Sequence, residues 1–227
     1  MDTENAVRLL DSATKLLGVM IWPAVVAFIL VRFGSKISEV IGSLSEFTFK
    51  GAGFEASARK RQTEAAAALV AASASRPEAG ATPETLGNAA RQSVQIIGEL
   101  SPRNLRQIEG TKVLWVDDNP DNNTHERQSL EALGVRFVLS TSTDDALNKV
   151  KIQKFDAIIS DMGRPPDHTA GYTLLDALRS SGDQTPFIIY ASSRAPEHQA
   201  EAKRRGAVGC TNRPTELFAM VLSVLNR

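Results

Sequence analysis

Cysteine is almost absent from this chain of 227 residues, since Cys210 is its single representative. One cysteine excludes an intrachain disulfide and favours a reducing compartment. An excess of charge is also missing, because Lys+Arg and Asp+Glu both number 26. The two signs nearly balance on each side of Thr111 as well, so charge gives no reason to expect a nucleic-acid partner. A P-loop, a glycine-rich dinucleotide motif and Cys/His metal spacing are missing too.

Charge is absent altogether from residues 16–31, a run of 16 residues between Lys15 and Arg32. As a helix it would be about 24 Å long, slightly short of a bilayer core of about 30 Å. Phe33 extends the apolar run, and the flanking Lys15 and Arg32 can reach the membrane interface with their charges while their stems stay buried. We therefore expect a membrane span over residues 16–33. Acidic residues before the run disfavour a signal peptide, and its uniformly apolar surface disfavours an interfacial helix. A buried core helix is the remaining alternative.

Cations are more numerous after this run than before it. The positive-inside rule then places the C-terminal part in the cytoplasm. The predicted localisation is a bacterial inner membrane, crossed once.

We divide the chain into four parts. Residues 1–35 hold the tail and the transmembrane helix, and residues 36–71 a juxtamembrane helix and a small hairpin over 47–57. Residues 72–110 contain a flexible linker (72–84) and an amphipathic helix (85–100), and residues 111–227 form the main domain. An apolar stripe over 37–47 could pack on copies of itself, giving a homo-oligomer, or on its own neighbours. The alanine-rich stretch 59–71 favours helix, and Ser101-Pro102 is typical of a helix start.

From Lys112 onward, short apolar runs alternate with helical patterns. The expected strands are 113–116, 135–139, 156–160, 186–191 and 207–210. The expected helices lie near 122–133, 143–153, 171–181, 196–205 and 215–226. Five strands that are each followed by a helix predict an α/β fold with a parallel sheet covered on both faces. Short right-handed connections favour a flavodoxin-like (βα)5 domain with strand order 2-1-3-4-5.

Carboxylates stand where the first and third of these strands end. Asp117 and Asp118 follow the first strand, and Asp161 follows the third. In the 2-1-3-4-5 order these strands are neighbours, so the three carboxylates converge at one edge of the sheet. Repulsion among them favours a bound cation, and oxygen ligands suit Mg²⁺. The alternative is that Asp117 and Asp118 cap the next helix while Asp161 starts a turn.

Residues 111–227 resemble the receiver domain of two-component response regulators. The resemblance rests on VLWVDDNP, FDAIISDMGRPPD, TPFIIYASS and GAVGCTNRP, and covers about half of the chain. It implies that Asp161 is the phosphoacceptor, with a histidine kinase or phosphotransfer protein as its partner. It also implies that Asp118 ligates Mg²⁺ directly, Asp117 mainly through water, and Gly163 through its backbone carbonyl.

The sequence departs from the family pattern around the fourth and fifth strands. Ala191 stands where the family has Thr or Ser, and Ser192 could substitute if the strand ended one residue later. Arg213 replaces the usual Lys and keeps the charge with a different geometry. Cys210 replaces the usual aromatic switch residue. The resemblance also points to a cis bond between Arg213 and Pro214.

The loop after Asp161 is about two residues longer than the family norm, and it brings Arg164, Asp167 and His168 near the pocket. An exposed loop histidine is the favoured interpretation of His168.

Two functions follow. The first is a membrane-anchored signalling protein that accepts a phosphoryl group at Asp161; this is a regulatory domain rather than an enzyme, although autophosphatase activity would fit. The second is a receiver-like interaction or oligomerisation module that works without phosphorylation. A Mg²⁺-dependent phosphatase is a weaker third, because the Asp-x-Asp motif expected after the first strand is missing from VDDNPDN.

Overall fold

The computed structural model describes residues 54–75, 83–191 and 195–226. No helix within these ranges is both long and apolar enough to cross a bilayer. The predicted span over residues 16–33 and the apolar stripe over 37–47 lie outside the described residues.

A five-stranded parallel sheet forms the centre of the domain, with strand order β2-β1-β3-β4-β5. Its strands are β1 (Lys112–Val116), β2 (Arg136–Ser140), β3 (Ala157–Ser160), β4 (Phe187–Tyr190) and β5 (Gly209–Thr211). This confirms the predicted flavodoxin-like order. The strands contain many β-branched and aromatic residues, and β1, β3 and β4 are almost entirely buried, as expected for a sheet covered on both faces.

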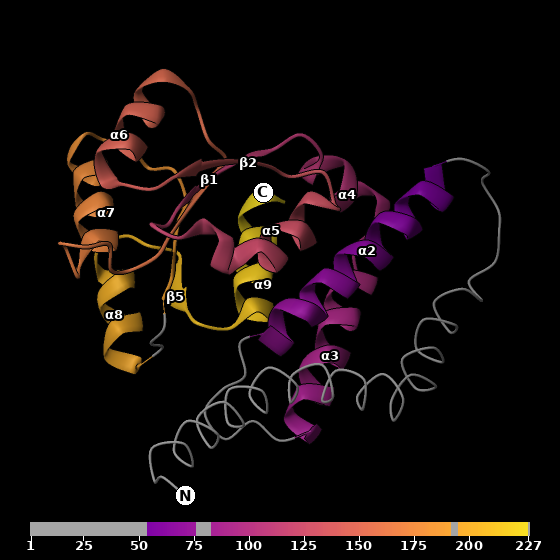
Figure 1. Ribbon diagram of the computed structural model, residues 1–227. Helices are drawn as coiled ribbons and strands as arrows, with labels where there is room; N and C mark the ends of the chain where they lie inside the picture. Colours follow the sequence, from indigo (N-terminus) through magenta and orange to yellow (C-terminus); the bar gives the residue numbers. More distant parts are fainter. Residues whose placement is uncertain (1–53, 76–82, 192–194, 227) are drawn as a thin grey trace, which may run out of the picture. The chain divides into compact units, whose positions relative to one another are not determined.

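Helices cover both faces of the sheet (Figure 1). On one face lie α6 (Thr143–Ile152), α7 (Ala170–Ser180) and α8 (Pro196–Arg204). On the other lie α5 (Thr124–Glu131), preceded by the short 3-10 helix η1 (Pro120–Asn123), and α9 (Pro214–Leu225). Successive residues of a strand point to opposite faces of the sheet. Leu114 therefore packs in the core beneath α6, α7 and α8, and Trp115 in the core beneath α5 and α9. All five predicted helices are confirmed within a few residues.

Three further helices precede the sheet: α2 (Phe54–Ser75), α3 (Pro83–Gly98) and α4 (Pro102–Ile108). They confirm the helices predicted from the alanine-rich stretch, the amphipathic pattern and Ser101-Pro102. The side chain of Ser101 caps α4 by accepting a hydrogen bond of 3.2 Å from the Asn104 backbone N–H. The Asn104 side chain in turn accepts one of 3.0 Å from the Ser101 N–H.

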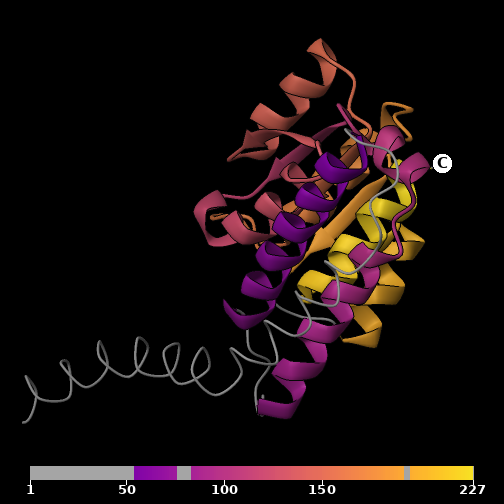
Figure 2. The same cartoon turned by 90° about the vertical axis from the view of Figure 1, so that its right-hand side faces the viewer.

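These helices belong to the same compact unit as the sheet. A stripe of small apolar residues on α2 is buried together with α5 and α9; it consists of Ala58, Ala65, Ala66 and Leu69. Both views place α2 beside α5 (Figures 1 and 2). The connector is thus an integral layer on one side of the receiver-like sheet.

Two predictions for the connector are wrong at their edges. The hairpin predicted over 47–57 cannot include residues 54–57, which form the first turn of α2. The flexible linker predicted over 72–84 is helical at both ends, because α2 continues to Ser75 and α3 begins at Pro83. Alanine and serine at 72–75 extend the helix, and proline at the first helical position starts the next one.

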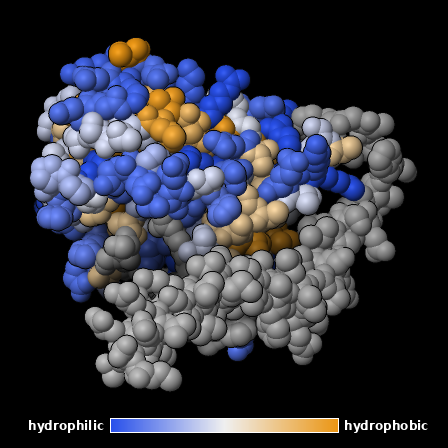
Figure 3. Space-filling model, viewed as in Figure 1, coloured by the Kyte–Doolittle hydropathy of each residue, from blue (hydrophilic) through white to orange (hydrophobic). Residues whose placement is uncertain are grey.

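The described part of one face is mostly hydrophilic, with apolar side chains in separate small patches (Figure 3). Ile152 at the end of α6 is the most exposed of the large apolar residues described, with 84% of its surface accessible. Single exposed apolar residues are normal on soluble domains. The chemistry of this domain has to be sought among its polar side chains.

Candidate functional site

Three carboxylates meet at the carboxyl ends of β1 and β3. These strands are neighbours, with Val116 paired to Ser160, so that Asp117 and Asp161 come directly after paired residues. Asp118 joins them, and one oxygen from each of the three side chains lies within 4.8 Å of the others. The structure thus brings together the residues that the sequence singled out, at the edge expected for a ligand site in a parallel α/β sheet.

Asp117 is held by the segment that follows it. One of its oxygens accepts a hydrogen bond of 2.8 Å from the backbone N–H of Asn119. The other accepts one of 2.6 Å from the amide of Asn123, a buried residue of η1. Asp118 is exposed. The orientation of Asp117 is therefore fixed by neighbours, while Asp118 has room to adjust to a ligand.

Asp161 is largely enclosed, with 14% of its side chain accessible. Its backbone N–H donates to the Val116 carbonyl at 3.0 Å, which ties the start of the loop to β1. Burial, reinforced by the charges of Asp117 and Asp118, raises the pKa of Asp161 to about 7, although Arg164 pulls that pKa in the opposite direction. A bound cation would favour the ionised form.

Arg164 forms an ion pair with Asp161 through its Nη1 atom. The same atom donates to the hydroxyl of Ser160 at 2.8 Å, and Nη2 donates to the hydroxyl of Thr143 at 3.1 Å. Only 4% of the Arg164 side chain is accessible. The sequence placed Arg164 near the pocket but gave no hint of this pairing, because nothing in the residue order says that the side chain turns inward.

The roles predicted for Gly163, Ser192 and Arg213 stay predictions. Gly163 is exposed, two positions after Asp161, and its carbonyl as a metal ligand stays a prediction. Ser192 lies outside the described residues. Arg213 precedes α9 and donates to Glu216 at 3.3 Å, with 38% of its side chain accessible. Its role toward a phosphoryl group stays a prediction.

The two other departures from the family pattern are buried. Ala191 follows β4 and donates from its backbone to the Thr211 carbonyl at 3.0 Å. Cys210 lies in β5 and is buried. The cis bond suggested for Arg213-Pro214 is wrong, since the cis peptide among the described residues joins Pro165 and Pro166.

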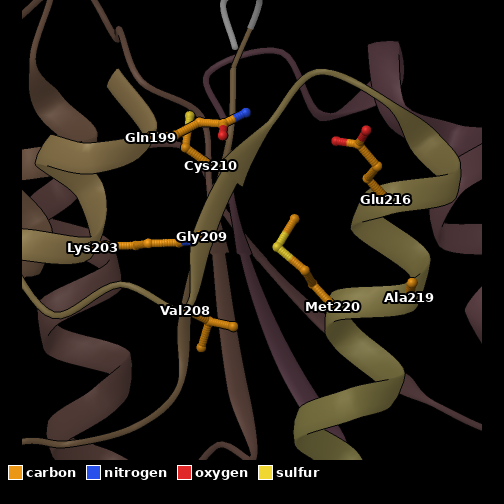
Figure 4. Close-up of a pocket in the computed structure, with 8 residues that line it drawn as sticks. All are labelled: Gln199, Lys203, Val208, Gly209, Cys210, Glu216, Ala219 and Met220. Atoms are coloured by element: carbon orange, nitrogen blue, oxygen red, sulfur yellow. The ribbon is translucent and has the colours of Figure 1, made fainter. Parts of the chain in front are cut away.

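A shallow groove of about 400 Å³ runs along the edge strand β5, between α8 and α9 (Figure 4). Lys203 and Gln199 reach toward it from α8, and Glu216 and Met220 line it from α9. Two strands, β4 and β5, stand between β3 and this side of the sheet. The groove is therefore separate from the acidic cluster.

The acidic cluster fits Mg²⁺ by its donor set. All three side chains offer carboxylate oxygens, the ligands that this ion prefers. Their spacing is close to the separation of ligands around one small ion, and the exposed Asp118 leaves room for retained water. Asp117, Asp118 and Asp161 are the residues that would hold the ion.

Comparisons with known proteins identify the family of this domain. The family model of the response regulator receiver domain matches residues 113–224. The sensor histidine kinase RcsC of Escherichia coli strain K12 is 28% identical over 105 residues, which are 46% of this chain and 11% of that protein. The RcsC of Salmonella typhi is 27% identical over 108 residues, 48% of this chain and 11% of that protein. The chain thus spans a small fraction of the curated relatives that it matches.

Solved structures of receiver domains are similar as well. The receiver domain of the Francisella response regulator 1452 is 23% identical, with a TM-score of 0.46, covering 52% of this chain and 97% of that one. The chemotaxis response regulator CheY4 of Vibrio cholerae is 28% identical, with a TM-score of 0.44, covering 50% and 98%. The family match, the sheet order and the acidic cluster together define residues 113–224 as a response regulator receiver domain.

Proposed function

We propose that the chain is a membrane-anchored signalling protein whose receiver domain binds Mg²⁺ and accepts a phosphoryl group at Asp161. The observation that carries this proposal is the meeting of Asp117, Asp118 and Asp161 at the ends of two adjacent strands. A receiver domain is a regulatory phosphoacceptor module, which supports a role of this chain in two-component signalling. The phosphoryl donor would be a histidine kinase or a histidine phosphotransfer protein.

In this proposal Asp161 acts as the nucleophile. Its ionised carboxylate oxygen attacks the phosphorus of a phosphohistidine, a P–O bond forms, and the P–N bond breaks with its electron pair left on the imidazole nitrogen. The product is an aspartyl phosphate. Asp117 is oriented by Asn119 and Asn123, so this carboxylate is in position before the donor arrives. Mg²⁺, when bound, would offset the negative charge that the carboxylates and the phosphoryl group bring together.

The residues expected to contact the phosphoryl group of the phosphorylated protein differ from the family pattern. Ala191 supplies no hydroxyl after β4, and Arg213 supplies a guanidinium in place of an ammonium group. A guanidinium fits phosphate oxygens with two parallel hydrogen bonds. We propose that Arg213 and Ser192 contact the phosphoryl group once Asp161 is phosphorylated.

The membrane anchor rests on the sequence of residues 16–33, with its uncharged core between Lys15 and Arg32. A single-pass topology with the receiver domain at the cytoplasmic face of a bacterial inner membrane follows from the flanking cations. The apolar stripe over residues 37–47 would support a homo-oligomer there. Signal output would then pass through contacts at the membrane, and no contact with nucleic acid is expected.

A second candidate function is an interaction module that works without phosphorylation. The observation that favours it is the layer formed by α2, α3 and α4 on the side of α5 and α9. Such a layer could hold the receiver domain in one state permanently. Under this alternative Asp161→Asn would leave signalling and partner binding unaltered in cells, whereas the leading proposal expects both to change.

Trp115 gives a direct test of the proposed site. It is buried two residues before Asp117, and the Arg127 guanidinium lies 5.9 Å from its ring while also donating to the Pro120 carbonyl. A ligand that rearranges residues 117–120 will thus alter its surroundings. In full-length protein with Trp22→Phe, Mg²⁺ plus beryllofluoride should change the Trp115 fluorescence, and Asp161→Asn should abolish this change. An equal response in the Asn variant would refute phosphoryl binding at Asp161.

A further inference from the structure

Hydrogen bonds within the loop after Asp161 fix the backbone of Arg164. Backbone hydrogen bonds of 2.8 Å join Arg164 and Asp167 in both directions, closing a tight turn around Pro165 and Pro166. The Asp167 carboxylate then accepts hydrogen bonds from the Thr169 backbone at 2.7 Å and from the Thr173 hydroxyl at 2.6 Å. The loop is therefore fastened to the first turn of α7, and the backbone of Arg164 has a defined position.

The side chain of Arg164 turns inward from this loop. Its guanidinium lies between β3 and the start of α6, where it contacts Asp161, Ser160 and Thr143. Arginine is rarely buried unless it is paired, because removing a charge from water is costly. Here the pairing partner is the acceptor carboxylate itself, and the Nε atom of Arg164 is buried without a hydrogen-bond partner. The fold thus holds the positive charge of Arg164 against the carboxylate of Asp161.

Because of this position, Arg164 and Mg²⁺ would compete for the Asp161 carboxylate. The Arg164 charge already offsets part of the negative charge of the three carboxylates. A divalent ion at Asp117, Asp118 and Asp161 would lie a few ångströms from the guanidinium, where like charges repel strongly in a partly buried site. Because Arg164 already pairs with the Oδ1 atom of Asp161, a metal ion would also have to share that carboxylate with the guanidinium.

We propose that Arg164 is a tethered cation that competes with Mg²⁺ for the Asp161 carboxylate and lowers the affinity of the site for the metal. The inference rests on the proposed function, since it concerns regulation of the same Mg²⁺ site. In the metal-free protein Arg164 keeps Asp161 paired. Metal binding and phosphoryl transfer then require the guanidinium to move off the carboxylate, and its hydrogen bonds to Ser160 and Thr143 can hold it nearby. Arg164 is in this sense a regulatory, positioning residue.

Calorimetric titration of the full-length protein with MgCl2 tests this competition. We expect Arg164→Gln to bind Mg²⁺ about tenfold more tightly than the parent protein, because the repelling charge is gone. Arg164→Lys keeps the charge and should stay within about threefold of the parent. Arg204→Gln is the matched control, since it removes the same charge from an exposed ion pair with Glu201 on α8. Its affinity should be unchanged.

The outcomes separate this inference from the proposed function. If the Gln variant is folded by thermal denaturation and binds Mg²⁺ equally or more weakly, the competition is overturned, while phosphorylation of Asp161 in the parent would leave the proposed function standing. If neither protein binds Mg²⁺, both fall together. If the Gln variant and the Arg204 control both gain affinity alike, only general electrostatics is at work and the role of Arg164 is refuted.

Discussion

Arg61 of α2 donates a hydrogen bond of 2.5 Å from Nη2 to the backbone carbonyl of Leu133, just after the end of α5. Its Nε atom donates to the Ala132 carbonyl at 3.3 Å, and Nη1 lies 3.3 Å from the Glu109 carboxylate. The last carbonyls of a helix lack partners within the helix, and a cation is favoured beside them. Arg61 thus fastens the connector to the receiver domain.

We expect Arg61→Met to lower the free energy of unfolding by about 1–3 kcal/mol, because it removes charged donors from helix-end carbonyls. Lys60→Met is the matched control, since Lys60 is 78% exposed and pairs only loosely with Glu64 at 3.8 Å. Urea unfolding of both variants measures the difference. Equal stability of the two variants would show that α2 is not fastened through Arg61.

Leu69 provides a second test of the connector. It is fully buried in the core shared by α2, α5 and α9. Leu69→Ala should cost about 2–5 kcal/mol of unfolding free energy, as truncation of a buried leucine does in well-packed cores. Ala67→Ser on the exposed side of α2 should change it little. A loss near zero for Leu69→Ala would mean that α2 leaves the receiver domain in solution.

The βα alternation was enough to predict the sheet order and the convergence of the acids, because strand periodicity and right-handed crossovers leave few topologies. The docking of α2 was not predictable in the same way. Its buried face is made mostly of alanine, so hydrophobic periodicity is weak, and the stretch is typical of an isolated helix as much as of a packed one.

The pairing of Arg164 with Asp161 escaped prediction for a different reason. It depends on the tight turn closed by Arg164 and Asp167 and on hydroxyls from two separate elements, Ser160 and Thr143. Thr143 is 21 positions away in the sequence. A short spacing between an arginine and an aspartate in a loop gives no direction for the side chain. The long Pro-Pro loop was the available signal, and it pointed only to the vicinity of the pocket.

Gly171 tests how closely α7 packs on the site. A Cβ atom at this position would lie 2.5 Å from the backbone oxygen of Asp161. Gly171→Ala should therefore displace that backbone, cost about 1–3 kcal/mol of stability and weaken Mg²⁺ binding. Gly98→Ala is the control, since nothing lies within 4 Å of its added methyl group at the end of α3. Denaturation and metal titration of both variants check the expectation, and identical results would contradict it.

The raised pKa of Asp161 predicts a pH-dependent stability without metal. Its pKa is about 7 in the folded protein against an ordinary value of 3.8, so near pH 6 the folded state keeps a proton that the unfolded state has lost. That proton leaves as the pH rises, and the advantage of the folded state goes with it. The free energy of unfolding should fall by about 1 kcal/mol between about pH 6 and pH 8, after allowance for solvent screening.

Asp161→Asn isolates this contribution. The three histidines, His125, His168 and His198, are exposed and are present in both proteins, so their contribution is the same in each. The slope of stability against pH should therefore be shallower in the Asn variant than in the parent, measured by urea unfolding in the presence of a chelator. Parallel slopes would show that Asp161 is ionised throughout this range.

Acceptance of a phosphoryl group by Asp161 is tested most directly by locating that group on the chain. Full-length protein is incubated with acetyl phosphate and MgCl2, digested, and mapped by mass spectrometry, with Asp161→Asn treated in parallel. We expect phosphorylation on the peptide that contains Asp161, dependent on Mg²⁺ and lost in the Asn variant. A parent protein that is folded, binds Mg²⁺ and still carries no phosphoryl group on Asp161 would contradict the account.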